Sequence, residues 1–369
     1  MQPNEEMREA TRFMVRRPVP TAFATIRKMR ASMKMVQPYF FPIAIGAAML
    51  LPGAIRSGAQ TLDSQPLSVE AKISLGDVRG RIDHMAIDPT RNRLFVAELG
   101  NDSVGVVDLN SRQVIHRITR LNEPQGVGYE PSADALYVSN AGDGSVRIYQ
   151  AGDFKEIGRI ELGDDADNIR IDVGESRVLV GFGNGAIAVI DAAKKSKIAE
   201  FDLPAHPESF QLDRKTNRIF VNVPKSMAIA VIDLAVNKET TTWPMINAIG
   251  NFPMAFDDDL QRVLVAFRTP ATLGAFSASD GRNVASVDLC GDADDVFVDA
   301  KRHRAYVSCG QGFIDVFDTR DPGYRHTARI PTVSGARTSY FDPSIDRLFL
   351  AVRATSSGPA AIWVFRPAP

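Results

Sequence analysis

The sequence predicts an all-β fold, a seven-bladed β-propeller built from four-stranded blades. Two observations predict it. A pattern of short apolar strands recurs seven times at a nearly constant spacing, and no segment shows a convincing helical period of apolar residues. Repeats of roughly 40 residues that each hold four short strands are typical of β-propellers.

Each repeat opens with a pair of strands, and the first strand usually ends in Asp or Glu. The pairs are 84–88 with 93–99, 126–130 with 135–140, 168–172 with 177–182, 209–213 with 218–223, 253–257 with 262–267, 295–299 with 304–309, and 338–342 with 347–352. One apolar residue at the same position of each second strand serves as its anchor. These anchors are Val96, Val138, Val180, Val221, Val265, Val307 and Leu350, and successive anchors are 42, 42, 41, 44, 42 and 43 residues apart. We interpret the acidic residue that recurs at the end of the first strand as a turn former; it is Asp88, Asp172, Asp213, Asp299 or Asp342 in five of the repeats.

A third apolar strand and a fourth, more polar strand complete each repeat. Examples are the third strand at 187–191 and the fourth strands at 113–121 and 197–203. Turn pairs such as Asn184-Gly185 stand between the second and third strands, which indicates hairpins. Apolar runs in these two strands suit strands that pack between neighbouring blades.

The seventh repeat has only three strands and ends near Phe365. A strand-like segment, Val69 to Leu75, precedes the first repeat, and we expect it to supply the outer strand of the last blade. This closure leaves no open sheet edge that would invite aggregation. We therefore expect a single propeller over residues 60–369 and a separate N-terminal head, residues 1–59.

The head is basic and the body is acidic. Residues 1–59 carry nine Lys and Arg against three Asp and Glu, although the whole chain has a net charge of −1. An apolar run from Tyr39 to Ala54 ends near Ser57 and Ala59, which predicts a signal peptide cleaved after Ala59 and a periplasmic or secreted protein. The alternative is an uncleaved anchor, the only membrane contact we expect, although the run is short and contains two prolines.

Several second strands resemble one another in a further way. Tyr137-Val138-Ser139-Asn140 is a near match to a YVTN motif, and the segments at 220–223 and 306–309 are degenerate forms of it. The body thus resembles the YVTN-repeat β-propellers, the YncE-like group of secreted bacterial proteins. The resemblance implies the fold and leaves the activity open, because propellers host enzymes and binding modules alike.

The crossings from the outer strand of one blade to the inner strand of the next must all emerge on one face, around the central channel. These segments are polar and differ from blade to blade, as one asymmetric ligand site would require; solvated channel lining and turn chemistry are the alternative. We expect a small ligand, a cation or a partner peptide to bind there. The candidate residues are Arg81, Asp83, His84, Glu123, Gln125, Asp165, Asp167, Asn168, His206, Glu208, Ser209, Asn251, Asp292, Asp294, Asp295, Arg337 and Thr338.

The acidic excess of this ring favours a cation or a basic ligand. With His84 and His206 it also suits a divalent cation, although no cofactor is certain. A hydrolase or lyase is the alternative function, with His84 or His206 as general base. The sequence has no G-x-S-x-G elbow and no C-x-x-C-H haem motif.

The only two cysteines, Cys290 and Cys309, fall near the same face, and in an oxidising compartment they could pair. The acidic body argues against nucleic-acid binding. We expect a monomer whose partner, a small molecule or a protein, binds at the crossing-loop face.

Overall fold

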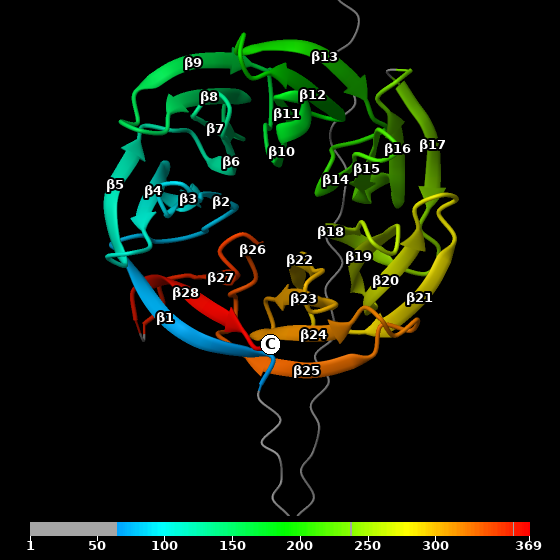
Figure 1. Cartoon of the computed structure of the whole chain (residues 1–369). Coiled ribbons are helices and arrows are strands. Elements are labelled where there is room, and N and C mark those ends of the chain that lie inside the picture. The colour runs from blue at the N-terminus through cyan, green and yellow to red at the C-terminus, as the bar shows by residue number, and fades with distance from the viewer. Residues whose placement is uncertain (1–64, 237, 357) are drawn as a thin grey trace, which may run out of the picture. The chain divides into compact units, whose positions relative to one another are not determined.

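The computed structural model describes residues 65–236, 238–356 and 358–369. They form seven four-stranded antiparallel sheets that follow one another around a ring (Figure 1). The predicted seven-bladed β-propeller is therefore confirmed. Within these residues, no helix has the length and apolar character needed to cross a membrane.

Each blade runs from an inner strand at the channel to an outer strand at the rim. The first blade is β2 (Met85–Asp88), β3 (Arg93–Glu98), β4 (Ser103–Asp108) and β5 (Gln113–Thr119), and the second is β6 (Pro124–Glu130), β7 (Ala135–Asn140), β8 (Ser145–Gln150) and β9 (Glu156–Glu161). The third is β10 (Ile169–Asp172), β11 (Arg177–Phe182), β12 (Ala186–Asp191) and β13 (Ser196–Asp202), and the fourth is β14 (Phe210–Asp213), β15 (Arg218–Val223), β16 (Ala228–Asp233) and β17 (Lys238–Pro244). The fifth is β18 (Ile249–Asp257), β19 (Arg262–Thr269), β20 (Ala271–Ser277) and β21 (Asn283–Asp288), and the sixth is β22 (Ala293–Asp299), β23 (Arg304–Cys309), β24 (Phe313–Asp318) and β25 (His326–Pro331). Three short 3₁₀ turns occur at η1 (Leu99–Asn101), η2 (Val173–Glu175) and η3 (Pro224–Ser226).

The seventh blade joins the two ends of the domain. It consists of β26 (Ser339–Asp342), β27 (Arg347–Val352), β28 (Ala360–Pro367) and, as its outer strand, β1 (Leu67–Gly76). The blue β1 lies along the red β28 in Figure 1, with Leu67 opposite Pro367. The ammonium of Lys72 sits 3.7 Å from the centre of the Trp363 ring and adds a cation–π contact to this pair. The predicted closure is confirmed.

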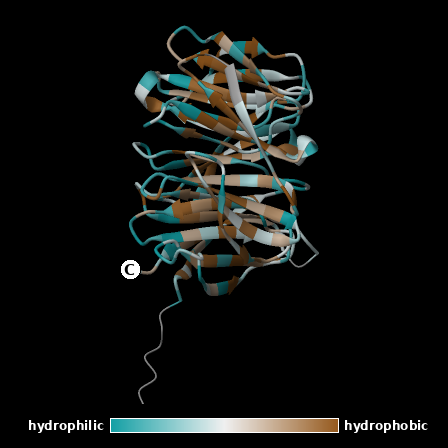
Figure 2. Cartoon of the chain, turned by 90° about the vertical axis from the view of Figure 1, so that its right-hand side faces the viewer, coloured by the Kyte–Doolittle hydropathy of each residue, from teal (hydrophilic) through white to brown (hydrophobic). Residues whose placement is uncertain are grey.

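The core lies between the blades. All seven second-strand anchors, from Val96 to Leu350, are fully buried. Figure 2 shows the hydrophobic colour following the strands, with hydrophilic residues gathered in the connecting loops. Burying apolar surface stabilises the folded state by roughly 25 cal/mol per Å². A blade cannot bury both of its faces alone, so the blades stack side by side into a ring.

The acidic residues that end the inner strands form turns on the face opposite the crossings. Asp88 Oδ1 accepts hydrogen bonds from the backbone N–H groups of Thr90 and Arg91, at 3.0 and 3.1 Å. Asp342 accepts one from Ser344 N at 2.8 Å. These contacts agree with their interpretation as turn formers. The predicted head, the cleavage after Ala59 and the boundary with the propeller lie outside the described residues.

Candidate functional site

The crossing segments share one face with the turns between second and third strands. Gly100 N donates to Arg81 O at 2.9 Å in the first blade, and Gly183 N donates to Asp164 O at 3.0 Å in the third. Each crossing is thereby fixed to the blade that it enters. We call the opening of the channel on this face the mouth.

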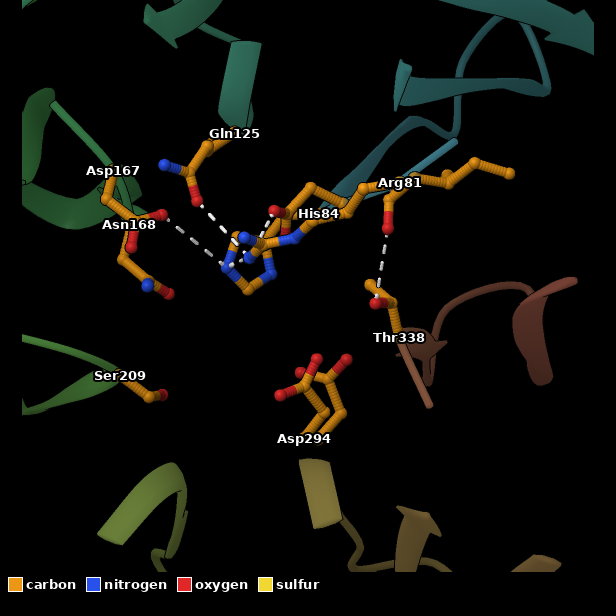
Figure 3. A network of polar contacts seen from close by, with 12 residues as sticks. Arg81, His84, Gln125, Asp167, Asn168, Ser209, Asp294 and Thr338 are labelled. Carbon is orange, nitrogen blue, oxygen red and sulfur yellow. Dashed lines mark hydrogen bonds and ion pairs between the residues drawn. The ribbon is translucent and has the colours of Figure 1, made fainter. Parts of the chain in front are cut away.

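Asp167 of the third blade lies between two histidines from other blades. Its Oδ1 is 3.9 Å from His84 Nε2 and its Oδ2 is 3.9 Å from His206 Nε2. His84 Nε2 is also 3.8 Å from Asp83 Oδ1, and His206 Nδ1 is 3.5 Å from Asp165 Oδ2. Figure 3 shows Asp167 and His84 pointing toward each other. We call these five residues the imidazole cluster.

The backbone of Asp167 is held by close packing of the second and third blades. A Cβ on Gly126 would overlap the Asp167 carbonyl oxygen, so only glycine lets the strands approach this far. The Ser139 hydroxyl donates to the same carbonyl, and Asp167 N donates to Gly181 O at 2.9 Å. The position of the carboxylate is therefore set by the fold rather than by a ligand.

One oxygen of the Asp167 carboxylate has no hydrogen-bond partner among the described residues. This oxygen, Oδ1, is buried, and the whole residue is only 7% exposed. Asp83 is more deeply buried, at 2% exposed, and its Oδ2 also makes no hydrogen bond among the described residues, but this oxygen has an ion pair with Arg81 Nη2 at 2.7 Å. Arg81 also contacts Gln125 Oε1 at 3.3 Å. A buried carboxylate oxygen without a donor is costly, and such oxygens mark places where a ligand or water donates.

The mouth combines groups with shifted pKa values. Burial raises the pKa of Asp83 to about 6, against the opposing effect of the positive groups beside it. Burial and the charge of Asp167 raise the pKa of Glu208 to about 7. Burial alone would lower the pKa of His206, but the Asp167 carboxylate, the Gly183 carbonyl and Asp165 raise it to about 9. Burial works likewise against the charged form of Asp167, but the histidines lower its pKa.

The opposite side of the mouth carries a second group of charges. Arg268 Nη2 lies 2.6 Å from Asp294 Oδ1, and Arg337 Nη1 lies 2.7 Å from Asp292 Oδ1. The cross pairs are also short, with Arg268 Nε 3.3 Å from Asp292 and Arg337 Nε 3.1 Å from Asp294. We call these four residues the arginine–aspartate cluster. Because two guanidinium groups face two carboxylates, this cluster neutralises itself.

Three further predicted residues lie along the channel below the mouth. Asn168 Oδ1 and Ser209 Oγ accept hydrogen bonds from Arg170, at 3.4 and 3.0 Å. Asp295 accepts one from Ser339 N at 2.7 Å, and burial raises the pKa of Asp295 well above its usual value. Two of the predicted residues, Asn168 and Ser209, thus contact Arg170, which was not itself among the predicted site residues.

The remaining predicted residues have structural contacts. Thr338 Oγ1 donates to Ile82 O at 3.4 Å. Glu123 is exposed in a turn, where its N–H donates to Asp102 Oδ1 at 2.9 Å. Asn251 is fully buried and its amide donates to Ala228 O at 3.0 Å, so it links two blades. Neither Glu123 nor Asn251 joins the two clusters at the mouth.

Below the mouth the channel is a cavity of about 430 Å³. Its wall includes the middle residue of every inner strand. In chain order these residues are Ala86, Gly128, Arg170, Gln211, Ala255, Phe297 and Tyr340. Arg170 is the one charged residue at this repeat position, which is the signal by which the sequence could have revealed it. Arg268 lies just past the repeated second-strand segment, and no recurring pattern marks it.

Cys290 and Cys309 form a disulfide with an S–S distance of 2.03 Å and a Cα–Cα distance of 5.9 Å. The bond joins the segment that leaves β21 to the end of β23, so it ties the fifth blade to the sixth. Asp292 of the arginine–aspartate cluster is two residues from Cys290. The disulfide thus fixes the crossing that presents this side of the mouth.

The chemistry of the mouth is that of charged hydrogen-bonding groups. Across the described segments, no group of three or more His, Cys, Asp or Glu side chains is placed so that it could hold a metal ion. His84 and His206 contact carboxylates and, in His206, the Gly183 carbonyl at 2.6 Å.

Comparison with known proteins supports the fold. No protein-family model matches the chain, and no curated protein matches it. A Kuenenia stuttgartiensis hydrazine synthase structure is 18% identical, with a TM-score of 0.69 over 80% of this chain and 96% of that chain. A chain in the crystal structure of a mitotic checkpoint complex is 13% identical, with a TM-score of 0.71 over 89% of this chain and 99% of that chain. At these identities the similarity is one of fold alone.

Proposed function

We propose that this protein is a binding protein that takes the cationic nitrogen group of a small molecule at the mouth of its channel. The observation that carries the proposal is Asp167 Oδ1, a buried carboxylate oxygen without a hydrogen-bond donor among the described residues. An ammonium or amidinium group offers the N–H donor that this oxygen lacks, together with a full positive charge.

The charge distribution at the mouth supports the same class of ligand. The arginine–aspartate cluster pairs two guanidinium groups with two carboxylates, whereas the imidazole cluster and Glu208 bring four carboxyl groups together with two imidazoles and the single guanidinium of Arg81. Groups in such a partly dry opening interact more strongly than they do in water. A cation entering between the two clusters is therefore drawn toward Asp167 rather than toward the paired aspartates.

A divalent cation stays the second expectation for this opening. We favour an organic cation because, in the part of the chain that the structure describes, no three ligating side chains converge. Divalent ions need several oxygen or imidazole ligands within about 2.0–2.6 Å. A single carboxylate flanked by imidazoles at 3.9 Å suits an N–H donor better.

We retain binding over the hydrolase or lyase alternative for a similar reason. General-base catalysis requires a base within hydrogen-bonding reach of the proton that it removes. His206 is instead committed to the Gly183 carbonyl and to two carboxylates. His84 is the residue on which an enzymatic function would have to rest.

We further propose that the protein is exported and belongs among the YVTN-repeat propellers. The basic head with its apolar run and the YVTN-like second strands support this. The disulfide adds support, because such bonds persist mainly in oxidising compartments such as the periplasm.

The binding proposal is tested by titrating the purified propeller with alkylamines, guanidines and carboxylic acids of matched length in a calorimeter. We expect amines or guanidines to bind and the acids not to bind. Asp167→Asn should weaken this binding by at least about 10-fold, since it removes one charged partner. The matched control, Asp108→Asn, changes an aspartate in a turn on the opposite face and should bind like the wild type. Equal binding by Asp167→Asn and wild type would contradict the proposal.

A further inference from the structure

Arg170 lines the channel at a position that recurs once in each blade, and it is the one charged residue among the seven that occupy this position. The equivalent residues in the other six blades are Ala, Gly, Gln, Ala, Phe and Tyr. A guanidinium in the interior of a propeller has to be held by the fold or be used by a ligand. Its contacts decide between these two possibilities.

The partners of Arg170 hold it in place without neutralising it. Its guanidinium donates to Asn168 Oδ1 at 3.4 Å, to the Ile169 carbonyl at 2.8 Å and to Ser209 Oγ at 3.0 Å. The guanidinium also lies 5.4 Å from the centre of the Phe210 ring. Among the described residues, the guanidinium forms no ion pair within 4.0 Å, and the charges of Asp295 and Asp167 act on it only from farther away. Its removal from water outweighs their attraction and lowers the pKa of Arg170, so its charge is poorly compensated.

Asp295 lines the same cavity and is the nearest candidate for a counter-ion of Arg170. Its carboxyl accepts the Ser339 N–H instead, and among the described residues it forms no ion pair within 4.0 Å. Burial and the charge of Asp294 raise the pKa of Asp295 well above its usual value in spite of Arg170, which favours the neutral acid. The channel therefore presents a positive group beneath an opening that is rich in carboxyl groups.

We propose that the channel holds the carboxylate of a small zwitterion on Arg170, while the cationic nitrogen of the same molecule sits at Asp167. The inference rests on the proposed function and names the class of ligand for it. A guanidinium carries more N–H donors than its three present contacts use, and carboxylate is the anion that matches its planar geometry. Doubly charged phosphate suits the site less well, because the negative charge of Asp167 also acts at Arg170 and repels a dianion more strongly than a carboxylate.

The rest of the cavity suits the body of such a molecule. Ala86, Gly128 and Ala255 leave room in the wall, and Phe297 and Tyr340 form an edge-to-face pair with ring centres 6.1 Å apart. The volume of about 430 Å³ lies within the range of small-molecule sites. We therefore expect amino acids or ω-amino acids with a short hydrocarbon body.

The test is a calorimetric titration with a series of probes of increasing length. Glycine, β-alanine, 4-aminobutyrate and 6-aminohexanoate are compared with the alkylamine and the carboxylic acid of equal chain length. In the wild type, the best zwitterion should bind at least about 10-fold more tightly than its matched amine, as one charged contact predicts. In Arg170→Met this advantage should disappear while the amine still binds. Arg214→Met, which alters an exposed arginine outside the channel, is the matched control and should keep the advantage.

The outcomes separate the two proposals. If amines bind but zwitterions bind no better, or if Arg170→Met keeps the zwitterion advantage, the Arg170 inference is overturned and the proposed function stands. If neither amines nor zwitterions bind, the proposed function is overturned and the inference with it. If only the carboxylic acid binds and its binding needs Arg170, carboxylate binding at Arg170 is supported and the cation site at Asp167 is refuted.

A milder variant guards against misfolding. Removing an unpaired charge should leave the melting temperature of Arg170→Met unchanged or raise it. Should that variant fail to fold, Ser209→Ala removes one hydrogen bond that orients Arg170 and changes no charge. We expect Ser209→Ala to weaken zwitterion binding by about 3-fold and to leave amine binding unchanged. Unchanged binding of the zwitterion by Ser209→Ala would then count against the inference.

Discussion

Aspartates are buried on both faces of the propeller, and their partners differ. On the turn face, Asp213 is fully buried and accepts hydrogen bonds from Lys215 N, Thr216 N and the Thr216 hydroxyl, all within its own turn. At the mouth, Asp167 is nearly as buried, but its charged neighbours come from two other blades and one of its oxygens has no donor among the described residues.

The pKa values of one aspartate from each face, Asp88 and Asp83, differ in the same way. Burial works against ionisation of Asp88, but Thr90 and Arg91 lower its pKa. At the mouth, burial prevails and raises the pKa of Asp83 to about 6. The ionised Asp88 thus stabilises the fold, whereas the ionised Asp83 is kept at a cost to stability, a pattern common at functional sites.

The sharpest test of this contrast compares Asp213→Ala with Asp167→Ala. Asp213→Ala removes a fully buried carboxylate that accepts three hydrogen bonds from its own turn, so we expect a loss of about 2–3 kcal/mol in the free energy of unfolding. Asp167→Ala should lose less, about 1 kcal/mol, because His206 keeps its contacts with the Gly183 carbonyl and Asp165 when the Asp167 carboxylate is removed. Urea unfolding of both variants measures the difference. Equal losses would mean that Asp167 serves the fold as Asp213 does.

A second test uses pH. The pKa of Asp83 rises from 3.8 to about 6 on folding, so the stabilising contribution of this carboxyl is complete below pH 3.8 and is lost as the pH rises through about 6. Asn cannot titrate. Between pH 4 and pH 7, the free energy of unfolding of Asp83→Asn should therefore rise by about 2–3 kcal/mol relative to that of the wild type.

The turn face supplies the control for this titration. Because the pKa of Asp88 is lowered on folding, its contribution is present above its unfolded value of 3.8 and is lost as the pH falls through the lower folded value. The advantage of the wild type over Asp88→Asn should thus shrink toward low pH. Parallel pH curves for the Asp83 and Asp88 variants would remove the distinction between the faces.

An effect of similar size is expected for His206, at higher pH. Its pKa rises from 6.5 to about 9 on folding, so its contribution is complete below pH 6.5 and is lost as the pH rises through about 9. The advantage of the wild type over His206→Gln should fall by about 2–3 kcal/mol across this window. An NMR titration of the imidazole C–H signal gives the pKa directly, and a midpoint near 6.5 would disprove the coupling to Asp167.

The fold could be predicted from the sequence because repetition makes its physics visible. Val96 and its six equivalents recur at fixed spacing because each fills the same gap between blades, and all seven are buried. The recurring Asp88 position was equally readable, since a turn imposes the same requirement in every blade. The outer strand of the last blade followed from the missing fourth strand after Phe365.

The site was harder to predict because it depends on what does not repeat. The ring of crossing segments led to Asp167, His84 and His206, but the distances among three different blades are not encoded in any one repeat. Arg170 was overlooked because it sits inside an inner strand, whereas the candidate residues were chosen from the crossing segments, which end at Asn168 in this blade. Comparing the seven residues at each repeat position, and looking for the one that differs from the rest, would have revealed Arg170.

The pairing of β1 with β28 has a consequence for how the protein is made. Leu67 and Pro367 are neighbours in space, yet one is synthesised among the first residues of the domain and the other almost last. The ring cannot close until nearly the whole domain has left the ribosome, and such distant pairings form slowly. We propose that the chain is exported. In that case the late pairing keeps the propeller from closing, and the chain competent for translocation through a pore, until the C-terminal strand has also crossed.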